Sequence, residues 1–526
     1  MLSFEPLTPT AFLRRCASVD PERIAVVDGG FRVNYGELWA RARMLAGALA
    51  ALDVPPGGRV AVLAANSHIL LEAHYGVPLA GAVLVALNMR LSPRELGYIL
   101  EHSEASVLLC DPQLEPLGRD AIAASDGGTR LVGAAEYEHL VEGSSEIVCA
   151  VDDERQLLSI NYTSGTTGRP KGVMYHHRGA YLQALAMAYH FRLTPSSVYL
   201  WTLPMFHCNG WCFTWAVTAA AARHVCIPRP DPAAVWRLID EEEVSHLCAA
   251  PTVLIDLASH EAAHRPLRPV RIATGGAPPS PALLERFEQL NIDVEHLYGL
   301  TETFGPVMIC DWKPEWDNLS PERRARLKAR QGVANVIAEP ARVVTEGGND
   351  VPADGETLGE IALRGNDLML GYYKDPEATA AAVPDGWFRT GDLGVMHPDR
   401  YVELRDRSKD VIISGGENVA SIEVEQAVAS HPAVLEVAVV ARADERFGER
   451  PVAFVRLASG AEASDQEIIE HVRTQLASFK APSEVLFVDD LPRTSTGKVQ
   501  KFMLRRQLVQ ALAQPTKKER EWTTKR

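Results

Sequence analysis

The chain has 526 residues, a formal net charge of −15 at pH 7, 46% hydrophobic residues and 23% charged residues. This composition is ordinary for a globular protein and excludes bulk disorder, while the negative charge argues against global attraction to nucleic acid or anionic lipid. At about 150 residues per domain, the length predicts three or four structural units, which a large α/β fold can merge.

The eight cysteines are scattered along the chain, and none follows Cys310. Such a distribution is unlike a secreted disulfide framework and fits reduced thiols in a cytosol. His207, Cys208 and Cys212 lie close together in sequence, but no second ligand pair with zinc-like spacing follows, so buried thiols are favoured over a metal site.

Residues 1–15 show no signal peptide, and the C-terminal Thr-Lys-Arg does not match the peroxisomal address. The longest apolar run, about twelve residues, is shorter than the ~20 that a membrane span needs. We therefore expect a cytoplasmic protein without a transmembrane segment.

The first half of the chain alternates short apolar runs with helical patterns. Residues 59–64, 82–87 and 106–110 are typical of buried strands, and residues 70–79 and 93–102 between them are typical of helices. The same rhythm returns from residues 225–227 to residues 245–250. This alternation predicts an α/β fold with parallel sheets, and the absence of a short tandem repeat argues against a solenoid.

The pattern changes after about residue 335. Short alternating segments at 360–363 and 401–404, separated by Gly, Asp and Pro, predict a small antiparallel β unit. From residue 411 the order is strand, helix (421–430), strand (434–440), strand (452–457) and helix (465–478). We therefore predict a large N-terminal body, residues 1–408, and a small C-terminal α+β domain, residues 409–526, whose basic tail is frayed.

A glycine-rich segment at residues 162–172 reads Tyr-Thr-Ser-Gly-Thr-Thr-Gly-Arg-Pro-Lys-Gly and follows a strand-like run. Glycine lets the backbone approach an anion closely, and successive amides and hydroxyls can surround a triphosphate. The segment is not a common P-loop, because no Gly-Lys-Ser/Thr closes it, and a plain surface loop would not need such a composition. The predicted phosphate-binding residues are Thr163, Ser164, Gly165, Thr166, Thr167, Gly168 and Lys171.

This segment resembles the phosphate loop of the adenylate-forming superfamily, which includes acyl-CoA synthetases, adenylation domains of peptide synthetases and beetle luciferases. Four further motifs follow in the family order: residues 298–303 (nucleotide and metal), 390–392 (ribose), 407–418 (hinge) and 492–498 (catalytic lysine). The resemblance covers nearly the whole chain. It implies two α/β subdomains and a β-barrel-like unit in the body, with a mobile C-terminal lid domain.

The resemblance also implies the reaction: a carboxylate attacks the α-phosphate of ATP and gives an acyl-adenylate and pyrophosphate. Glu302 is the expected Mg²⁺ contact, with Thr166 as a second candidate, since magnesium prefers few carboxylates together with phosphate oxygens. Thr301 would hydrogen-bond the α-phosphate, and Tyr298 would lie against the adenine. The remaining candidate nucleotide contacts are Gly275, Gly276, Ala277, Gly299, Asp392 on the ribose, and Arg407.

The resemblance implies roles for two lysines, one in adenylation and one in the movement of the small domain. Lys498 would bridge the carboxylate and phosphate oxygens during adenylation, where losing one comparable donor costs on the order of 10²–10³ in rate. Lys409 occupies the hinge position, about which the small domain would rotate after adenylation. That rotation would remove Lys498 and bring Gly415 and Gly416 near the pantetheine of coenzyme A.

The segment Pro-Met-Phe-His-Cys-Asn-Gly-Trp at residues 204–211 bears on the acid. His207 matches the family's aromatic-or-histidine position, and it is a candidate for both catalysis and acid binding. Residues 201–230 contain no Asp or Glu. Domains that activate amino acids place an Asp near here, so we expect an acid without an α-amine. Trp211 offers apolar bulk for an acyl pocket, as do Phe213 and Trp215, although such a cluster is also typical of a core. Further candidate acid contacts are Thr274 and His296.

The extended segment at residues 312–333, together with Phe-His-Cys-Asn-Gly-Trp, resembles the medium-chain and aromatic acyl-CoA ligases and the plant-type acyl-activating enzymes. Short, medium, branched and aryl acids all remain open. We predict an acyl-CoA synthetase, an AMP-forming acid–thiol ligase that uses ATP, Mg²⁺ and coenzyme A and has no nucleic-acid partner. The sequence is compatible with a homodimer. It leaves open whether Arg442, Arg446 and Arg450 contact the nucleotide of coenzyme A.

Three alternatives stay open: an enzyme that loads a carrier-protein thiol, a luciferase-like oxidation, and a non-catalytic protein that keeps the fold.

Overall fold

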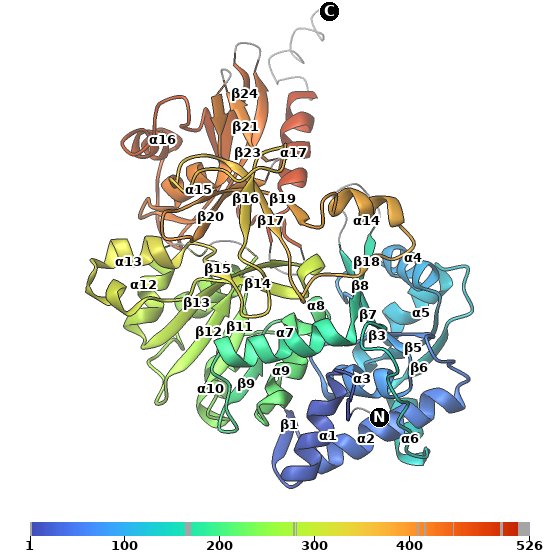
Figure 1. Ribbon diagram of the computed structural model, residues 1–526. Coiled ribbons are helices and arrows are strands. Elements are labelled where there is room, and N and C mark those ends of the chain that lie inside the picture. Colours follow the sequence, from blue (N-terminus) through green and yellow to red (C-terminus); the bar gives the residue numbers. More distant parts are fainter. Residues whose placement is uncertain are drawn as a thin grey trace, which may run out of the picture. The chain divides into compact units, whose positions relative to one another are not determined.

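A computed structural model describes residues 3–163, 170–276, 279, 281–407, 410–414, 417–444, 447–494 and 498–513. Contacts between Cα atoms divide the chain into two compact units (Figure 1). The large unit comprises Met1–Ala341 with Ala362–Arg389, and the small unit comprises Arg342–Ile361 with Thr390–Arg526. Each unit is described by itself.

The first sheet of the large unit has nine strands, and its central strands, from β1 to β13, pair in parallel. Antiparallel strands close both of its edges. In spatial order the strands are β15 (Val333–Ala334), β14 (Gly305–Ile309), β13 (Ile292–Leu300), β12 (Val270–Thr274), β11 (His246–Ala249), β9 (Val198–Trp201), β10 (Arg223–Cys226), β1 (Ile24–Asp28) and β2 (Phe31–Asn34).

The second sheet of the large unit has seven strands, and it contains the three apolar runs predicted as strands near residues 59, 82 and 106. Five strands pair in parallel because helical crossovers connect them. In spatial order the strands are β18 (Gly371–Tyr372), β8 (Lys171–His176), β7 (Leu157–Thr163), β4 (Val83–Ala86), β3 (Arg59–Leu63), β5 (Ala105–Cys110) and β6 (Arg130–Gly133).

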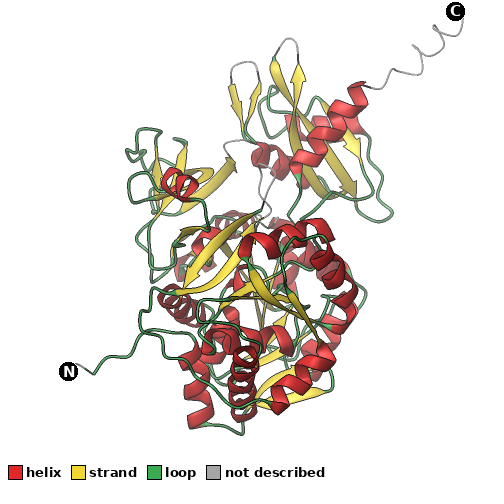
Figure 2. Cartoon of the chain, turned by 90° about the vertical axis from the view of Figure 1, so that its right-hand side faces the viewer, coloured by secondary structure: helices red, strands yellow, loops and turns green. Residues whose placement is uncertain are grey.

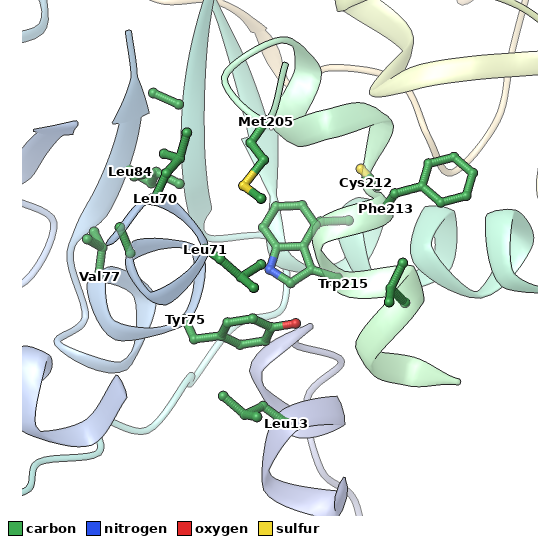
Figure 3. Close-up of a cluster of buried hydrophobic side chains, with 14 of the residues drawn as sticks. Leu13, Leu70, Leu71, Tyr75, Val77, Leu84, Met205, Cys212, Phe213 and Trp215 are labelled. Atoms are coloured by element: carbon green, nitrogen blue, oxygen red, sulfur yellow. The ribbon is translucent and has the colours of Figure 1, made fainter. Parts of the chain in front are cut away.

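Local signals fix several helices of the large unit. Helix α4 (Pro93–Ser103) begins with a capping box in which Ser92 and Glu95 each satisfy the other's backbone N–H, and Pro93 occupies its first turn. Helix α3 (His68–Leu79) is apolar on most sides and buried among residues of α9 (Phe213–Ala219), as Leu71, Tyr75 and Trp215 illustrate in Figure 3. The other helices are α1 (Thr10–Val19), α2 (Tyr35–Ala51), η1 (Pro112–Leu114), α5 (Glu115–Ala123), α6 (Ala134–Gly143), α7 (His177–His190), α8 (Cys208–Trp211), α10 (Pro232–Glu241), α11 (Pro251–Ser259), α12 (Pro281–Gln289), η2 (Thr301–Thr303), η3 (Pro314–Asn318), α13 (Pro321–Lys328) and α14 (Pro376–Ala382).

The small unit contains two sheets. The first is β16 (Arg342–Val344), β17 (Gly359–Leu363), β19 (Phe388–Met396) and β20 (Val402–Arg407). The second is β22 (Glu417–Val419), β21 (Ile412–Ser414), β24 (Gly448–Leu457) and β23 (Val434–Asp444), with β25 (Glu484–Phe487) beside β24. Its helices are α15 (Ser421–Ala429), α16 (Asp465–Arg473) and α17 (Lys501–Ala513). Leu504 and Leu508 of α17 pack on the apolar face of β23. Figure 2 shows this helix, which leads to the C-terminal end of the chain, beside the strands of the small unit.

The predicted α/β fold with a small C-terminal domain is confirmed. The four-stranded sheet groups with the C-terminal residues by contacts, and the functional boundary between residues 408 and 409 stays a prediction. Within the described residues, no helix is both long and apolar enough to cross a membrane. All eight cysteines lie in the described part of the chain as free thiols, and seven of them are buried.

Candidate active site

The strands β7 and β8 form a hairpin that frames the predicted phosphate loop. Thr163 at the end of β7 lies opposite Lys171 at the start of β8. Five predicted loop residues, Ser164, Gly165, Thr166, Thr167 and Gly168, lie outside the described residues. The hairpin therefore gives the two ends of the loop, and the roles of the five residues between them stay predictions.

A short polar chain joins the hairpin to the predicted metal contact. Lys171 Nζ lies 4.7 Å from the centroid of the Tyr372 ring and 3.9 Å from Asp375 Oδ2. The Tyr372 hydroxyl donates a hydrogen bond of 2.8 Å to Glu302 Oε1. Burial, and then the neighbouring Glu302, raise the pKa of Tyr372, so its hydroxyl keeps its proton and acts as the donor. Lys171 and Glu302, far apart in sequence, thus share one neighbour.

The backbone around Glu302 is fixed from several sides. Thr303 Oγ1 accepts a hydrogen bond of 2.9 Å from the Leu300 N–H, and the Tyr175 hydroxyl donates one of 2.5 Å to the Thr301 carbonyl. The Met369 N–H donates to the Glu302 carbonyl at 2.9 Å. These contacts hold η2 in one conformation, which is the preorganisation that a phosphate and metal site requires.

His207 lies at the entrance to an unusual turn. The residues that follow it, from Cys208 to Cys212, all have positive φ, although α8 has the hydrogen-bond spacing of a helix. Cys208 Sγ lies 3.8 and 3.9 Å from the two ring nitrogens of His207 and 3.7 Å from Thr301 Oγ1. The turn therefore brings His207 and Thr301 to the same thiol.

The thiols beside His207 are buried. Burial raises the pKa of Cys208 to about 12 and that of Cys212 well above its ordinary value. Among the described residues there is no group of three His, Cys, Asp or Glu side chains that could hold a metal ion.

Trp211 lies close to two glycines, Gly275 just after β12 and Gly305 at the start of β14. A Cβ atom at Gly275 would stand 3.1 Å from the Trp211 ring, and one at Gly305 would stand 3.0 Å from the Trp211 Cα. Phe213 and Trp215 are fully buried and belong to the hydrophobic core that Figure 3 shows. Of these aromatic residues, it is Trp211 that packs against the Gly275–Gly276 segment predicted to border the nucleotide.

Thr274 and His296, the two further acid-contact candidates, are neighbours on the parallel strands β12 and β13. Thr274 is fully buried, and its Oγ1 has no hydrogen-bond partner among the described residues. His296 Nδ1 donates to the carbonyls of Ala329 and Arg330, both at 3.0 Å, and burial lowers its pKa to about 4. The His296 ring therefore ties β13 to the end of the 312–333 segment, while Thr274 keeps a buried hydroxyl without a partner among the described residues.

Two of the glycines predicted to contact the nucleotide, Gly299 and Gly276, have different surroundings. Gly299 must lack a side chain, because a Cβ there would stand 1.9 Å from the Gly305 carbonyl oxygen. Gly276 has φ +87°, and apart from its chain neighbours no atom of the described residues lies within 4 Å of a Cβ built on it, so its backbone is open on that side within this part of the chain. Tyr298 is buried on β13, and Ala277 lies outside the described residues. Close packing on one side and open space on the other fit the flat base of a nucleotide.

In the small unit, Asp392 and Arg407 oppose each other on the antiparallel strands β19 and β20. Asp392 is 4% exposed and follows Gly391, whose φ is +71° and whose open Cβ side leaves room for a ligand. Lys498 closes a turn with Thr494: its N–H donates to Thr494 Oγ1 at 3.1 Å, and its carbonyl accepts from the Thr494 N–H at 2.7 Å.

The predicted hinge residue Lys409 lies outside the described residues, as do Gly415 and Gly416. The residues that flank Lys409 are held firmly. Asp406 accepts hydrogen bonds from the backbone N–H and the hydroxyl of Ser421 at the start of α15, and Asp410 pairs with Arg505 of α17. A rotation about Lys409 would therefore have to keep or exchange contacts that are already formed on both sides of it.

The comparison with protein families decides the identity. Residues 13–373 match the model of the AMP-binding enzyme, and residues 423–498 match that of the AMP-binding enzyme C-terminal domain. This protein belongs to the AMP-binding enzyme family. The predicted adenylate-forming superfamily is thereby confirmed.

Relatives of this AMP-binding enzyme include two plant ligases. The chain is 43% identical to the peroxisomal acetate/butyrate–CoA ligase of Arabidopsis thaliana and 42% identical to an acetate–CoA ligase of Humulus lupulus, in each case over 96% of this chain and 95% of the relative. Among solved structures, ATP-bound MatB from Rhodopseudomonas palustris is 29% identical and superposes with a TM-score of 0.84 over 95% of this chain and 99% of its own. The predicted class, an AMP-forming acid–thiol ligase of the acyl-CoA synthetase group, is confirmed, with ATP and coenzyme A as co-substrates.

Three contacts of this AMP-binding enzyme escape sequence reasoning: Tyr372 on Glu302, Asp375 near Lys171, and Asn209 on Asn161. The two ends of the first contact are 70 residues apart, and the strand β18 that carries Tyr372 has only two residues. Such a strand gives no periodic signal, so only the pairing of β18 with β8 reveals the contact.

A buried carboxyl group beneath the site predicts a pH-dependent stability. Asp367 is fully buried; burial raises its pKa to about 7, and it accepts a hydrogen bond of 3.0 Å from Asn335 Nδ2. Because the folded state retains this proton above the ordinary pKa of 3.8, its contribution to stability is lost as the pH rises from about 4 to 7. Asp367→Asn is expected to match the wild type near pH 4 and to melt a few °C higher at pH 8, as thermal unfolding would measure. A melting difference that stays constant between these pH values would contradict a titrating Asp367.

Proposed function

We propose that this AMP-binding enzyme activates short aliphatic acids without an α-amine, such as acetate, butyrate or 2-methylpropanoate, and transfers them to coenzyme A. In the first step the acid carboxylate attacks the α-phosphate of ATP and displaces pyrophosphate. In the second step the thiol of coenzyme A attacks the acyl carbonyl and releases AMP. The observation that carries the choice of acid is the position of Trp211.

Trp211 limits the space that an acyl chain can take. Trp211 is 7% exposed, and its ring lies 3.1 Å from the point where a Cβ on Gly275 would stand, so it fills the space beside the Gly275 backbone. We infer that an acid whose carboxylate lies toward Thr274 meets this ring after only a few methylene groups. The named acids of three relatives (acetate and butyrate, acetate, and 2-methylpropanoate) support this size.

The nucleotide side of the reaction rests on the residues of the large unit. Lys171 supplies positive charge at the base of the phosphate loop, and Thr301 supplies a hydroxyl that can donate to the α-phosphate. Glu302, oriented by Tyr372, is the proposed Mg²⁺ ligand, with Thr166 as a second one; when bound, the ion neutralises charge on the phosphates. His207 lies beside Thr301 on the shared Cys208 thiol, which suits a ring that borders the reacting carboxylate.

The small unit supplies the remaining groups. Asp392 and Arg407 would hold the ribose and the nucleotide, and Lys498 would offset the charge that develops between carboxylate and phosphate. Lys409 would then serve as the hinge between residues 1–408 and 409–526. After rotation about this hinge, Gly415 and Gly416 would flank the pantetheine.

We also propose a cytoplasmic location and keep the homodimer as a prediction. Two relatives carry peroxisomal names, so imaging of the tagged protein is the test of its location.

A panel of acids tests the choice of substrate. AMP formation that depends on coenzyme A should have its highest kcat/KM with acetate, propionate, butyrate or 2-methylpropanoate, and much lower values with octanoate, benzoate and cinnamate. The rival function, loading of a carrier-protein thiol, predicts adenylate formation without any acyl-CoA.

Trp211→Gly tests the limiting residue. Glycine tolerates the φ of +55° at this position and removes the indole, so we expect the preference to shift toward hexanoate and octanoate by roughly 10–100-fold in the ratio of kcat/KM values. Trp39→Gly, a change at a tryptophan on α2 of the large unit, is the matched control and should leave the preference unchanged. An unaltered preference in Trp211→Gly would refute Trp211 as the limit on chain length.

A further inference from the structure

Residues 208–212 form a left-handed helical turn at the acid site (α8 in Figure 1). Their φ angles are 50°, 52°, 62°, 55° and 61°, and four of the five residues are not glycine. The Gly210 N–H donates to the His207 carbonyl at 2.9 Å, and the Cys212 N–H donates to the Cys208 carbonyl at 3.2 Å. A left-handed conformation costs roughly 1–2 kcal/mol for each residue other than glycine, so the surrounding structure must hold this turn in place.

The side chain of Asn209 is the main polar anchor of the turn. It is fully buried, and its Oδ1 accepts hydrogen bonds from Asn161 Nδ2 at 2.7 Å and from Ser159 Oγ at 3.0 Å. Asparagine also tolerates the left-handed region better than most residues. A further hydrogen bond, from Thr214 Oγ1 to the Asn209 carbonyl at 3.0 Å, fixes the backbone from the other side.

The two partners of Asn209 lie on the strand that enters the phosphate loop. Ser159 and Asn161 belong to β7, whose last residue is Thr163. On its own side, Asn209 is two residues from His207 and two from Trp211. One buried amide therefore connects the proposed acid-binding turn directly to the strand that carries the proposed ATP-binding loop.

The connection has unused hydrogen-bonding capacity. Asn209 Nδ2 and Asn161 Oδ1 are both buried and have no partner among the described residues. If both amides rotate, Asn209 Nδ2 can donate to Asn161 Oδ1, so the pair has two bonded arrangements. An element with two discrete arrangements is what coupling between two sites requires.

We propose that Asn209 is a positioning residue that couples acid binding to ATP binding through Asn161 and Ser159. This proposal rests on the proposed function, because it takes residues 207–211 as the acid side and residues 163–171 as the phosphate side. An acid seated against the turn holds the Asn209 amide, the amide holds β7, and β7 fixes the entry to the phosphate loop. By reciprocity, ATP then favours the acid by the same factor.

The test is the binding of α,β-methylene-ATP, which cannot be cleaved at the α-phosphate, measured by calorimetry with and without saturating butyrate. In the wild type we expect butyrate to lower the Kd of the analogue by about 5–100-fold, the range typical of coupled sites. Asn209→Gly keeps the positive φ but removes both hydrogen bonds to β7. Butyrate should then leave the Kd of the analogue unchanged, while the Kd without butyrate stays within about twofold of the wild-type value. Thr214→Val, which leaves the side-chain bonds of Asn209 intact, is the matched control and should keep the coupling.

If Asn209→Gly does not fold, as circular dichroism would reveal, the double variant Ser159→Ala with Asn161→Ala breaks the same connection from β7 and leaves the turn sequence intact. Coupling that survives in the variants, or a wild type without coupling, would overturn the proposal. The proposed function has a separate readout, acid-dependent pyrophosphate exchange by the wild type. Exchange without an effect of Asn209 on coupling therefore refutes this inference alone.

Discussion

Lys498→Ala is expected to lower acid-dependent pyrophosphate exchange by about 10²–10³-fold. The reason is electrostatic: the acid carboxylate and the α-phosphate are both anions, and a preorganised ammonium group stabilises the charge that develops as they join. The backbone N–H and carbonyl of Lys498 are both hydrogen-bonded to Thr494, which fixes the point from which its side chain extends.

The informative comparison is between the two half-reactions. When acyl-adenylate is supplied directly, thioester formation by Lys498→Ala should stay within a few-fold of the wild type, because the lysine acts in the first step alone. Lys480→Ala removes another lysine of the small unit, one that pairs with Glu423, and serves as the control that should retain exchange. Normal exchange in Lys498→Ala, or equal loss of both half-reactions, would contradict this role.

Glu302→Gln is expected to raise the Mg²⁺ concentration required for half-maximal exchange by about 10–100-fold. Glutamine keeps the shape of the side chain and can still accept the hydrogen bond from Tyr372, so the backbone contacts of Thr301 and Met369 should persist. What is lost is the negative charge, and magnesium binds proteins chiefly through one or two carboxylates.

A titration of exchange activity against Mg²⁺ checks this result. Glu315→Gln, an exposed carboxylate in η3, is the control and should leave the titration unchanged. If Glu302→Gln lowered the maximal rate while the Mg²⁺ requirement stayed the same, Glu302 would act on the phosphates by another route and would not be the metal ligand.

The sequence predicts an element of the fold well where a continuous apolar run or a local capping signal marks it. The apolar run at residues 82–87 is β4, and the helix expected at 93–102 is α4, because Ser92, Pro93 and Glu95 mark its start within four residues. The pairing of β1 with β10 is not predictable in this way, since about 200 residues separate the strands and many apolar partners compete. Local chemistry thus fixes an element, and tertiary packing fixes its neighbours.

The residues of the candidate site likewise fall into those that local sequence identifies and those that only the fold reveals. Glycine spacing and motif order identify Lys171, Glu302 and Lys498, because their roles depend on flanking residues that are close in sequence. Tyr372 and Asn209 act through partners on other strands, and a single Tyr or Asn carries no pattern of its own. The left-handed turn from Cys208 to Cys212 is equally invisible, since Cys208, Trp211 and Cys212 disfavour that conformation and only the folded environment imposes it.

The most direct test of the account is to incubate the purified protein with ATP, Mg²⁺, butyrate and coenzyme A, and to quantify AMP, pyrophosphate and butyryl-CoA together by mass spectrometry. We predict equal amounts of all three products, no butyryl-CoA when ATP or butyrate is left out, and acid-dependent pyrophosphate exchange when coenzyme A is left out. AMP without any acyl-CoA, for butyrate and for every other acid of the panel, would contradict the assignment as an acyl-CoA synthetase.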